Sequence, residues 1–140
     1  MLFERIDLEI VTPERLVLSE TVDEVSLPGS DGYLGVLPGH APLLTGLSAG
    51  EVTYRAGEVT RHLAVSGGFV EVLRDRVSIL AETCERPDEI DADRALEDKK
   101  NAEGELARAS SEAEMRRARG RIAKADARLM VRRARATAGA

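Results

Sequence analysis

The residue pattern of the chain changes at Glu85-Arg86-Pro87-Asp88, and this change constrains the fold more than any other feature. Before it, short apolar runs alternate with turns that are rich in Gly, Pro and Asp. From Ile90 onward the chain has no proline, alanine is abundant, and charges of both signs interleave. The first pattern is typical of strands and the second of helices. We therefore expect two parts of different classes, residues 1–86 and residues 87–140.

The first part predicts an antiparallel β-sandwich or a flattened barrel. Phe3, Ile6, Leu8 and Ile10 nearly alternate with polar residues, which is the pattern of a half-buried strand. Similar apolar runs follow at short spacing up to Thr83, with no helical pattern between them, and they predict about nine or ten strands. Because the chain has no Trp and few other aromatic residues, Leu, Val, Ile and Ala have to fill the core.

The stretch from Pro28 to Pro42 has the densest turn signals. Its short apolar run, Tyr33 to Leu37, stands between two clusters of Gly and Pro that favour tight turns. This arrangement predicts a strand held between two loops of fixed shape. We expect the loops to present Asp31 and His40 at one end of a sheet.

The second part predicts two helices that pair as an antiparallel hairpin. Asp88 or Asp91 can cap the first helix, and Ser110 or Ser111 can cap the second. Small and apolar residues recur at steps of three and four, which is the spacing of a coiled-coil seam. The seam residues are Ala92, Ala95, Lys99, Ala102, Leu106 and Ala109 in the first helix and Met115, Ala118, Ile122, Ala125 and Leu129 in the second.

This seam is thin, because alanine lets two helices approach closely but buries little apolar surface. Gly104 and Gly120 weaken the helices further, by about 1 kcal/mol each relative to alanine. We therefore expect a hairpin of marginal stability by itself, which docks on another surface or changes partners.

Charge is unevenly distributed over the second part. Residues 88–114 hold ten acidic and four basic side chains, whereas residues 115–140 hold nine basic and one acidic. The basic excess predicts an anionic partner surface, although a solvated helix face explains it equally well. The net charge of the chain, −5, argues against a general nucleic-acid binder.

No set of side chains indicates catalysis or a metal site. His40 and His62 lack Cys or acidic neighbours at metal-ligand spacing, and no Ser-His-Asp set or phosphate-binding loop is evident. We expect both histidines to be structural and Cys84 to be a buried residue with no disulfide partner in the chain. We also expect no signal peptide, and no apolar run approaches the roughly 18 residues that a bilayer requires.

Three segments carry a resemblance to a known family. They are Gly29-Ser30-Asp31-Gly32-Tyr33-Leu34-Gly35-Val36-Leu37-Pro38-Gly39-His40-Ala41-Pro42-Leu43-Leu44, Ser66-Gly67-Gly68-Phe69-Val70-Glu71-Val72 and Ile90-Asp91-Ala92-Asp93-Arg94-Ala95. In this order, and with a sandwich followed by a helical hairpin, they resemble the epsilon subunit of the F-type ATP synthases of bacteria and chloroplasts. The likeness covers nearly the whole chain.

The resemblance implies a non-catalytic rotor subunit of the central stalk, which helps to couple proton flow to ATP synthesis. Its sandwich is expected to contact the gamma subunit and, through the loops with Asp31 and His40, the membrane c-ring. The hairpin is expected either to fold against the sandwich or to extend toward the catalytic alpha/beta head, where it restrains ATP hydrolysis. Arg128, Arg132 and Arg133 are the residues expected to contact beta.

The resemblance also implies a location and a regulatory ligand. The subunit is expected at the cytoplasmic side of the bacterial inner membrane, attached only through the complex. No cofactor is required, but residues 90–95 resemble the family's ATP-sensing motif, in which nucleotide favours the folded hairpin. The residues implied to bind nucleotide are Glu85, Ile90, Asp91, Arg94, Ala95, Lys124 and Arg128.

The same residues permit simpler interpretations. Lys124 stands where an arginine is usual in the family, and Asn101 stands where the strongest binders have an arginine. Asp91 can be only a helix cap, and Arg94 can simply pair with Asp98 one helical turn later. Two other functions also remain open. One is a free-standing nucleotide-sensing module, and the other is a structural adaptor whose basic last helix binds nucleic acid or another anionic surface.

Overall fold

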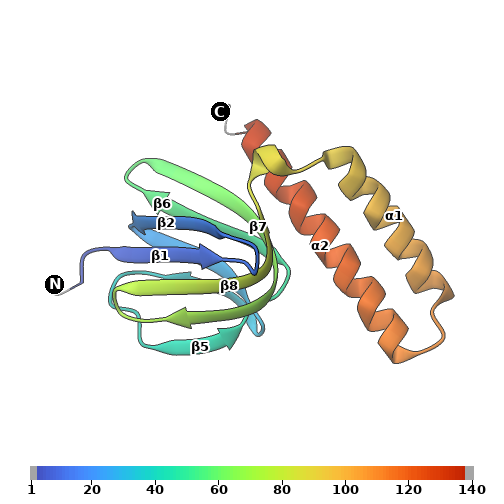
Figure 1. Ribbon diagram of the computed structural model, residues 1–140, viewed down its shortest axis with the longest axis horizontal. Coiled ribbons are helices and arrows are strands. Elements are labelled where there is room, and N and C mark those ends of the chain that lie inside the picture. The colour runs from blue at the N-terminus through green and yellow to red at the C-terminus, as the bar shows by residue number, and fades with distance from the viewer. Residues whose placement is uncertain (1–2, 138–140) are drawn as a thin grey trace.

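The computed structural model describes residues 3–137, with side chains described as far as Ala134. A β-sandwich is followed by a pair of long helices that lies against one end of it (Figure 1). The strands are β1 (Ile6–Val11), β2 (Leu16–Val22), β3 (Glu24–Gly29), β4 (Gly32–Val36), β5 (Leu43–Gly46), β6 (Gly50–Ala56), β7 (Val59–Val72) and β8 (Arg76–Glu85). A short 3-10 turn, η1 (Pro87–Glu89), leads to the helices α1 (Ala92–Arg108) and α2 (Glu112–Thr137).

The sandwich is built from one hydrogen-bonded sheet that folds over on itself. The strand order is β2-β1-β8-β7-β6-β3-β4, and β5 pairs with β7 beside this path. The predicted sandwich is therefore confirmed, but the flattened barrel is wrong, because the end strands β2 and β4 do not pair with each other to close the sheet. The neighbouring strands are antiparallel except for β1 and β8, which run parallel with Leu8 opposite Val77.

The described residues form eight strands rather than the predicted nine or ten, because β7 continues through a site that has the composition of a turn. Gly67 and Gly68 have φ values of 65° and 116°, which bend the strand. The register with β8 is the same on both sides of this bend. A side chain at Gly68 would collide with the backbone oxygen of Leu80. One strand of 14 residues therefore replaces two, and its two halves pair with β6 and β5.

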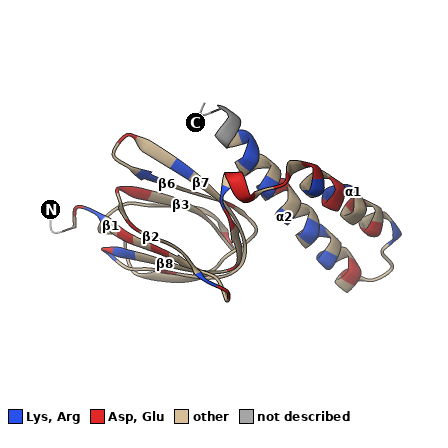
Figure 2. Ribbon diagram, turned by 45° about the horizontal axis from the view of Figure 1, so that its top comes forward, with Lys and Arg blue, Asp and Glu red and all other residues tan. Residues whose placement is uncertain are grey.

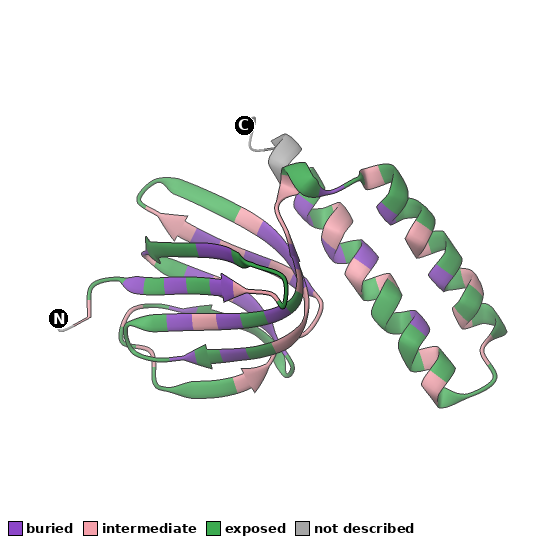
Figure 3. Ribbon diagram, in the orientation of Figure 1, coloured by how far each residue is buried: buried purple, intermediate pink, exposed green. Residues whose placement is uncertain are grey.

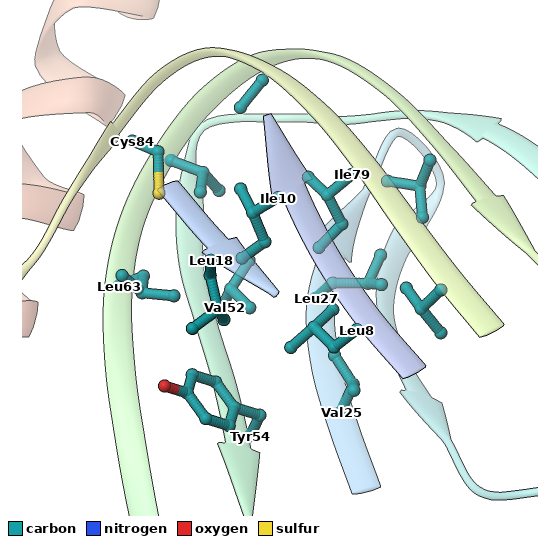
Figure 4. Close-up of a cluster of buried hydrophobic side chains, with 14 of the residues drawn as sticks. Leu8, Ile10, Leu18, Val25, Leu27, Val52, Tyr54, Leu63, Ile79 and Cys84 are labelled. Carbon is teal, nitrogen blue, oxygen red and sulfur yellow. The ribbon is translucent and has the colours of Figure 1, made fainter. Parts of the chain in front are cut away.

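The core lies between the two layers and is almost entirely aliphatic (Figure 4). In β1, Ile6, Leu8 and Ile10 are buried while the residues between them are exposed, as the alternation predicts. Tyr54 is the aromatic member of the described core. The largest fully buried side chains of the core are Ile6, Leu8, Ile10, Leu27, Leu63 and Ile79.

The helices form the predicted antiparallel hairpin, and alanine residues form its buried seam (Figure 3). Ala95 and Ala102 of α1 are fully buried, as are Ala118 and Ala125 of α2. The larger seam residues, Leu106, Met115, Ile122 and Leu129, are only half-buried. The two helix axes therefore lie close together while little apolar surface is removed from water.

Side chains cap both helices. The Asp91 carboxylate accepts a hydrogen bond from the backbone N–H of Arg94 at 3.1 Å, so Asp91 rather than Asp88 is the cap of α1. The Ser111 hydroxyl accepts a hydrogen bond from the backbone N–H of Glu114 at 3.1 Å. The Glu114 carboxylate in turn accepts one from the backbone N–H of Ser110 at 3.0 Å, so both serines contribute to the start of α2.

The hairpin docks on the sandwich through α2, which lies on β6 and β7 (Figure 1). The apolar part of this contact is small: Ala64 of β7, Ile90 of the connecting segment and Val131 of α2 form one buried cluster. Nearby, the Arg132 guanidinium donates a hydrogen bond to the Pro87 carbonyl at 3.0 Å. A few contacts therefore fix the position of two long helices.

Candidate functional site

A cleft of about 650 Å³ lies where β8, the β1–β2 turn and the two helices meet. Five of the seven residues predicted to bind nucleotide line it, namely Glu85, Asp91, Arg94, Lys124 and Arg128. The other two lie outside the lining. Ile90 is buried against Ala64 and Val131, and Ala95 is buried in the helix seam. The fold therefore brings together five predicted residues that are up to 43 positions apart in the chain, as between Glu85 and Arg128.

Local structure places each of these charged side chains. Glu85 is the last residue of β8, and Asp91 caps α1. Arg94 and Asp98 are one helical turn apart on α1, as Lys124 and Arg128 are on α2, so each pair shares one helix face. Because the helices are antiparallel, both faces meet at the end of β8.

Arg128 links three elements through its guanidinium, and only 14% of its side chain is exposed. Its Nε lies 2.9 Å from Oε1 of Glu85, an ion pair in which the Nε–H makes no hydrogen bond. Its Nη2 donates a hydrogen bond to the other oxygen of Glu85 at 3.3 Å, and Nη1 donates one to Oδ2 of Asp98 at 3.4 Å. Arg128 thus joins α2 to both β8 and α1.

Arg94 and Lys124 are differently placed. Within residues 3–134 their side chains form no ion pair or hydrogen bond, and both line the cleft. The alternative interpretation, a pair between Arg94 and Asp98, is wrong, because Asp98 pairs with Arg128 on the other helix. Arg94 and Lys124 are therefore the two cations of the cleft that an anionic ligand reaches without displacing a protein carboxylate.

The charges of the lining nearly cancel. Figure 2 shows α1, which has five acidic and four basic side chains, beside the mainly basic α2. Arg15 of the β1–β2 turn pairs with Glu89 at 2.8 Å, and Arg121 pairs with Glu105, which is not part of the lining. The carboxylates of the lining are Glu14, Glu82, Glu85, Glu89, Asp91 and Asp98. Its cations are Arg15, Arg94, Arg121, Lys124 and Arg128. A polyanion entering the cleft therefore meets slightly more negative than positive charge.

Asp31 and His40 do not lie at one end of a sheet, as the sequence led us to expect. Asp31 is in the turn before β4 and His40 follows the end of β4, so five residues of extended strand separate them. Asp31 is exposed. The Nδ1–H of His40 donates a hydrogen bond to the carbonyl of Ala41 at 2.7 Å. The imidazole ring therefore bonds to the backbone of its own loop.

The remaining titratable candidates have structural surroundings. Nδ1 of His62 lies 3.2 Å from Oε2 of Glu51. Both side chains are half-buried, and they belong to the neighbouring strands β7 and β6. Cys84 is buried in the sandwich core, and burial raises the pKa of its thiol to about 11. Among the described residues, no group of His, Cys, Asp and Glu side chains is arranged to hold a metal ion.

A second surface feature is a row of apolar residues on the outer face of the sandwich, made of Leu16, Val11, Leu80, Phe69 and Leu44. Val11 lies opposite Leu16 on one side and Leu80 on the other, and Leu80 lies opposite Phe69. Leu44 is two residues along β5 from the partner of Phe69, so it shares the same face. Leu44 and Phe69 are 72% and 62% exposed. We call these five residues the apolar row.

Comparison with known proteins identifies the family. Residues 5–87 match the family model described as ATP synthase, Delta/Epsilon chain, beta-sandwich domain. The ATP synthase epsilon chain of Koribacter versatilis is 52% identical over 106 residues, which cover 76% of this chain and 75% of that protein. The chain belongs to the ATP synthase epsilon chain family. A second epsilon chain, from Syntrophobacter fumaroxidans, is 49% identical over 114 residues, which cover 81% of this chain and 85% of that protein.

Solved structures of ATP synthases contain chains with the same fold. A chain in the cryo-EM structure of the Euglena gracilis mitochondrial ATP synthase, OSCP/F1/c-ring, superposes with a TM-score of 0.73 at 25% identity, over 87% of this chain and 76% of that one. A chain of the Tetrahymena thermophila central stalk and c-ring shares the fold, with a TM-score of 0.65 at 16% identity over 91% of this chain. The resemblance is therefore confirmed, as is assignment to a subunit of ATP synthase rather than to an enzyme in its own right.

No helix among residues 3–137 is both long enough and apolar enough to cross a bilayer.

The sequence of this epsilon chain did not reveal every residue of the cleft. Asp98 was assigned only to a pair with Arg94, although its place seven residues after Asp91 puts it on the same helix face. Arg15 and Glu14 enter the cleft from a turn some seventy residues earlier in the chain. No local pattern relates that turn to the helices, so only the folded chain brings it to the site.

Proposed function

We propose that this chain is the non-catalytic epsilon subunit in the rotor of a bacterial F-type ATP synthase, where it helps to couple proton flow to ATP synthesis. The observation that carries this proposal is its similarity to bacterial epsilon chains at about half identity over three quarters of its length. Such a subunit belongs to the peripheral part of the complex at the cytoplasmic side of the membrane.

The apolar row supports a protein partner on the sandwich. Exposed apolar residues aligned across several strands are typical of a surface that another protein covers. We assign this surface to the gamma subunit, which forms the shaft of the rotor. It is independent of the helical hairpin, because the row lies on β2, β1, β8, β7 and β5, whereas α2 packs on β6 and the first half of β7.

The loops with Asp31 and His40 are proposed contacts with the c-ring. Because β4 separates the two loops, one small contact cannot include both residues, and the positions need separate tests. Cross-linking from the substitutions Asp31→Cys and His40→Cys, each in the assembled enzyme, distinguishes them. A cross-link to the c-ring from only one position assigns the contact to that loop, and cross-links from neither argue against the assignment.

The hairpin is the proposed regulatory element. In the docked state Arg132 and Arg133 are exposed, whereas Arg128 is turned into the cleft. The small apolar contact with the sandwich favours a hairpin that is able to leave it. An extended hairpin would carry all three arginines toward the acidic surface of the catalytic head and so restrain ATP hydrolysis.

The cleft is the proposed site of regulatory ATP. Arg94 and Lys124 are free to bind phosphate oxygens, and Asp91 and Glu85 offer carboxylate acceptors to the N–H and O–H groups of a nucleoside. Because the lining comes from both the sandwich and the hairpin, any ligand that contacts both parts favours the docked state. No other cofactor is required for the rotor function.

The test is ATP hydrolysis by the assembled catalytic head, with the full chain or with a chain that ends at Pro87. We expect the shortened chain to assemble, because the sandwich has its own core, and to release the restraint on hydrolysis. Equal hydrolysis with both chains would exclude an inhibitory hairpin. Failure of the full chain to join the complex would exclude the rotor assignment itself.

A further inference from the structure

The cleft that we assign to nucleotide is partly filled by the protein's own charges. Arg128, one of the cations that phosphate requires, is already bound to two carboxylates. Glu85 approaches it with both oxygens, at 2.9 and 3.3 Å, and 26% of the Glu85 side chain is exposed. Asp98 approaches with one oxygen at 3.4 Å and is 45% exposed. The contact with Asp98 is therefore the looser and more accessible of the two.

The two carboxylates also differ in what they hold together. Glu85 belongs to β8, so its pair with Arg128 connects the hairpin to the sandwich. Asp98 belongs to α1, so its pair connects only the two helices. The helices are joined independently by their alanine seam and by ion pairs of Lys99 with Asp126 and of Arg121 with Glu105. Loss of the Asp98 charge therefore leaves the docked hairpin in place and frees the Nη1 edge of Arg128.

That Nη1 edge belongs to the same cleft lining as Arg94 and Lys124, the cations without a protein partner. A guanidinium binds phosphate best through two parallel N–H groups, and a carboxylate on one edge prevents this geometry. The carboxylate also repels the negative charge of the phosphate at close range. We propose that Asp98 competes with phosphate for Arg128 and thereby lowers the affinity of the cleft for nucleotide. This inference rests on the proposed nucleotide site and names the residue that regulates it.

The experiment compares Asp98→Asn with Glu97→Gln in the full chain. Glu97 is the neighbouring residue of α1, is exposed and does not line the cleft, so its substitution removes the same charge from the same helix. Calorimetric titration uses two probes, ATP and inorganic tripolyphosphate. We expect Asp98→Asn to bind both roughly three- to tenfold more tightly than the wild type, and Glu97→Gln to differ by less than about twofold.

A double substitution tests whether the effect passes through Arg128. In an Arg128→Ala background, Asp98→Asn is expected to give a clearly smaller gain in affinity, since the cation for which the two anions compete is absent and only the direct repulsion between Asp98 and phosphate is relieved. Asp98→Ala removes the acceptor altogether and is expected to act in the same direction as Asp98→Asn. Thermal melts of all variants identify any that fail to fold, and the comparison is restricted to those that melt as the wild type does.

The outcomes separate the two proposals. If the wild type binds ATP but Asp98→Asn and Glu97→Gln bind it equally, or Asp98→Asn more weakly, the competition is overturned while the nucleotide site stands. If neither ATP nor tripolyphosphate binds any variant, the nucleotide site and the competition are both overturned. The rotor assignment is unaffected by that result, since hydrolysis with the shortened chain tests it separately.

Discussion

Gly68 permits the bend of β7 because no side chain fits at its position. Its φ of 116° lies in a region that favours glycine, and a Cβ there would meet the backbone oxygen of Leu80. Gly57, in the β6–β7 turn, also has a positive φ, of 64°, but open space surrounds it. A substitution at Gly57 therefore measures the free-energy cost of the backbone conformation alone, whereas one at Gly68 adds the cost of a collision.

The first prediction follows from this comparison. Gly68→Ala is expected to lower the free energy of unfolding by about 2–4 kcal/mol, since it adds a collision with fixed backbone to the conformational strain. Gly57→Ala is expected to cost about 1 kcal/mol from strain alone. Urea denaturation of both variants measures the difference, and equal losses would show that the bend accepts a side chain.

Asp23 gives a prediction for acid conditions. The hydrogen bond that its carboxylate accepts from the Gly57 N–H at 2.6 Å, assisted by Arg5 and Arg55, holds the pKa of Asp23 below its ordinary value of 3.8. A folded-state pKa below the unfolded one adds stability above the unfolded pKa, and this contribution is lost as the pH falls through the folded pKa. Lowering the pH from 5 to 2 should therefore destabilise the wild type more than Asp23→Asn. Thermal melts of both proteins across this pH range measure the difference. Parallel curves for the two proteins would contradict the prediction.

Among the elements, α2 has a weak point at Gly120. This glycine is exposed in the helix interior, and a Cβ built there meets no atom within 4 Å. Gly120→Ala is therefore expected to stabilise the helix by about 1 kcal/mol, and Ala123→Gly, at a nearby exposed position, to destabilise it by a similar amount. Hydrogen exchange of the α2 amides measures both changes. Unchanged exchange in both variants would mean that the docked contacts, and not the helix itself, limit opening.

The elements also show what the sequence could and could not predict. Alternation identified β1, and the three- and four-residue steps identified the alanine seam, because both patterns depend on neighbours along the chain. The continuity of β7 was missed, since Gly67-Gly68 has the composition of a turn and only the pairing with β8 keeps it extended. The pair of Asp98 with Arg128 was missed for a similar reason. Its geometry depends on how two helices and a strand come together, which no local pattern specifies.

At the scale of the whole molecule, the sandwich and the hairpin differ in how they are held. The sandwich has a continuous aliphatic core, whereas the hairpin is attached to it by the cluster of Ala64, Ile90 and Val131 and by contacts of charged side chains. Salt weakens exposed ion pairs. Small changes in the cleft would therefore shift the hairpin between the docked state and the undocked state that we propose.

The last prediction uses this sensitivity. ATP is expected to protect the chain from proteolysis near the connecting segment, residues 86–91, because in the proposed site it would contact both parts at once. Arg94→Ala is expected to abolish this protection, since Arg94 is one of the two cations of the cleft lining whose side chains pair with no described residue. Arg116→Ala, on an exposed part of α2 outside the cleft, is the matched control and should keep it. Identical digestion of Arg94→Ala and the wild type with ATP would show that residues 90–95 serve only as the start of a helix.

The uninterrupted course of β7 has a mechanical consequence for the rotor role that we propose. A single covalent backbone passes from one layer of the sandwich to the other, so a twisting force on either layer is transmitted through peptide bonds instead of through sliding side chains. The body should consequently turn as one stiff block under load. The helices have no such strand in common with it, and torque strong enough to separate them from the body would leave that block undeformed.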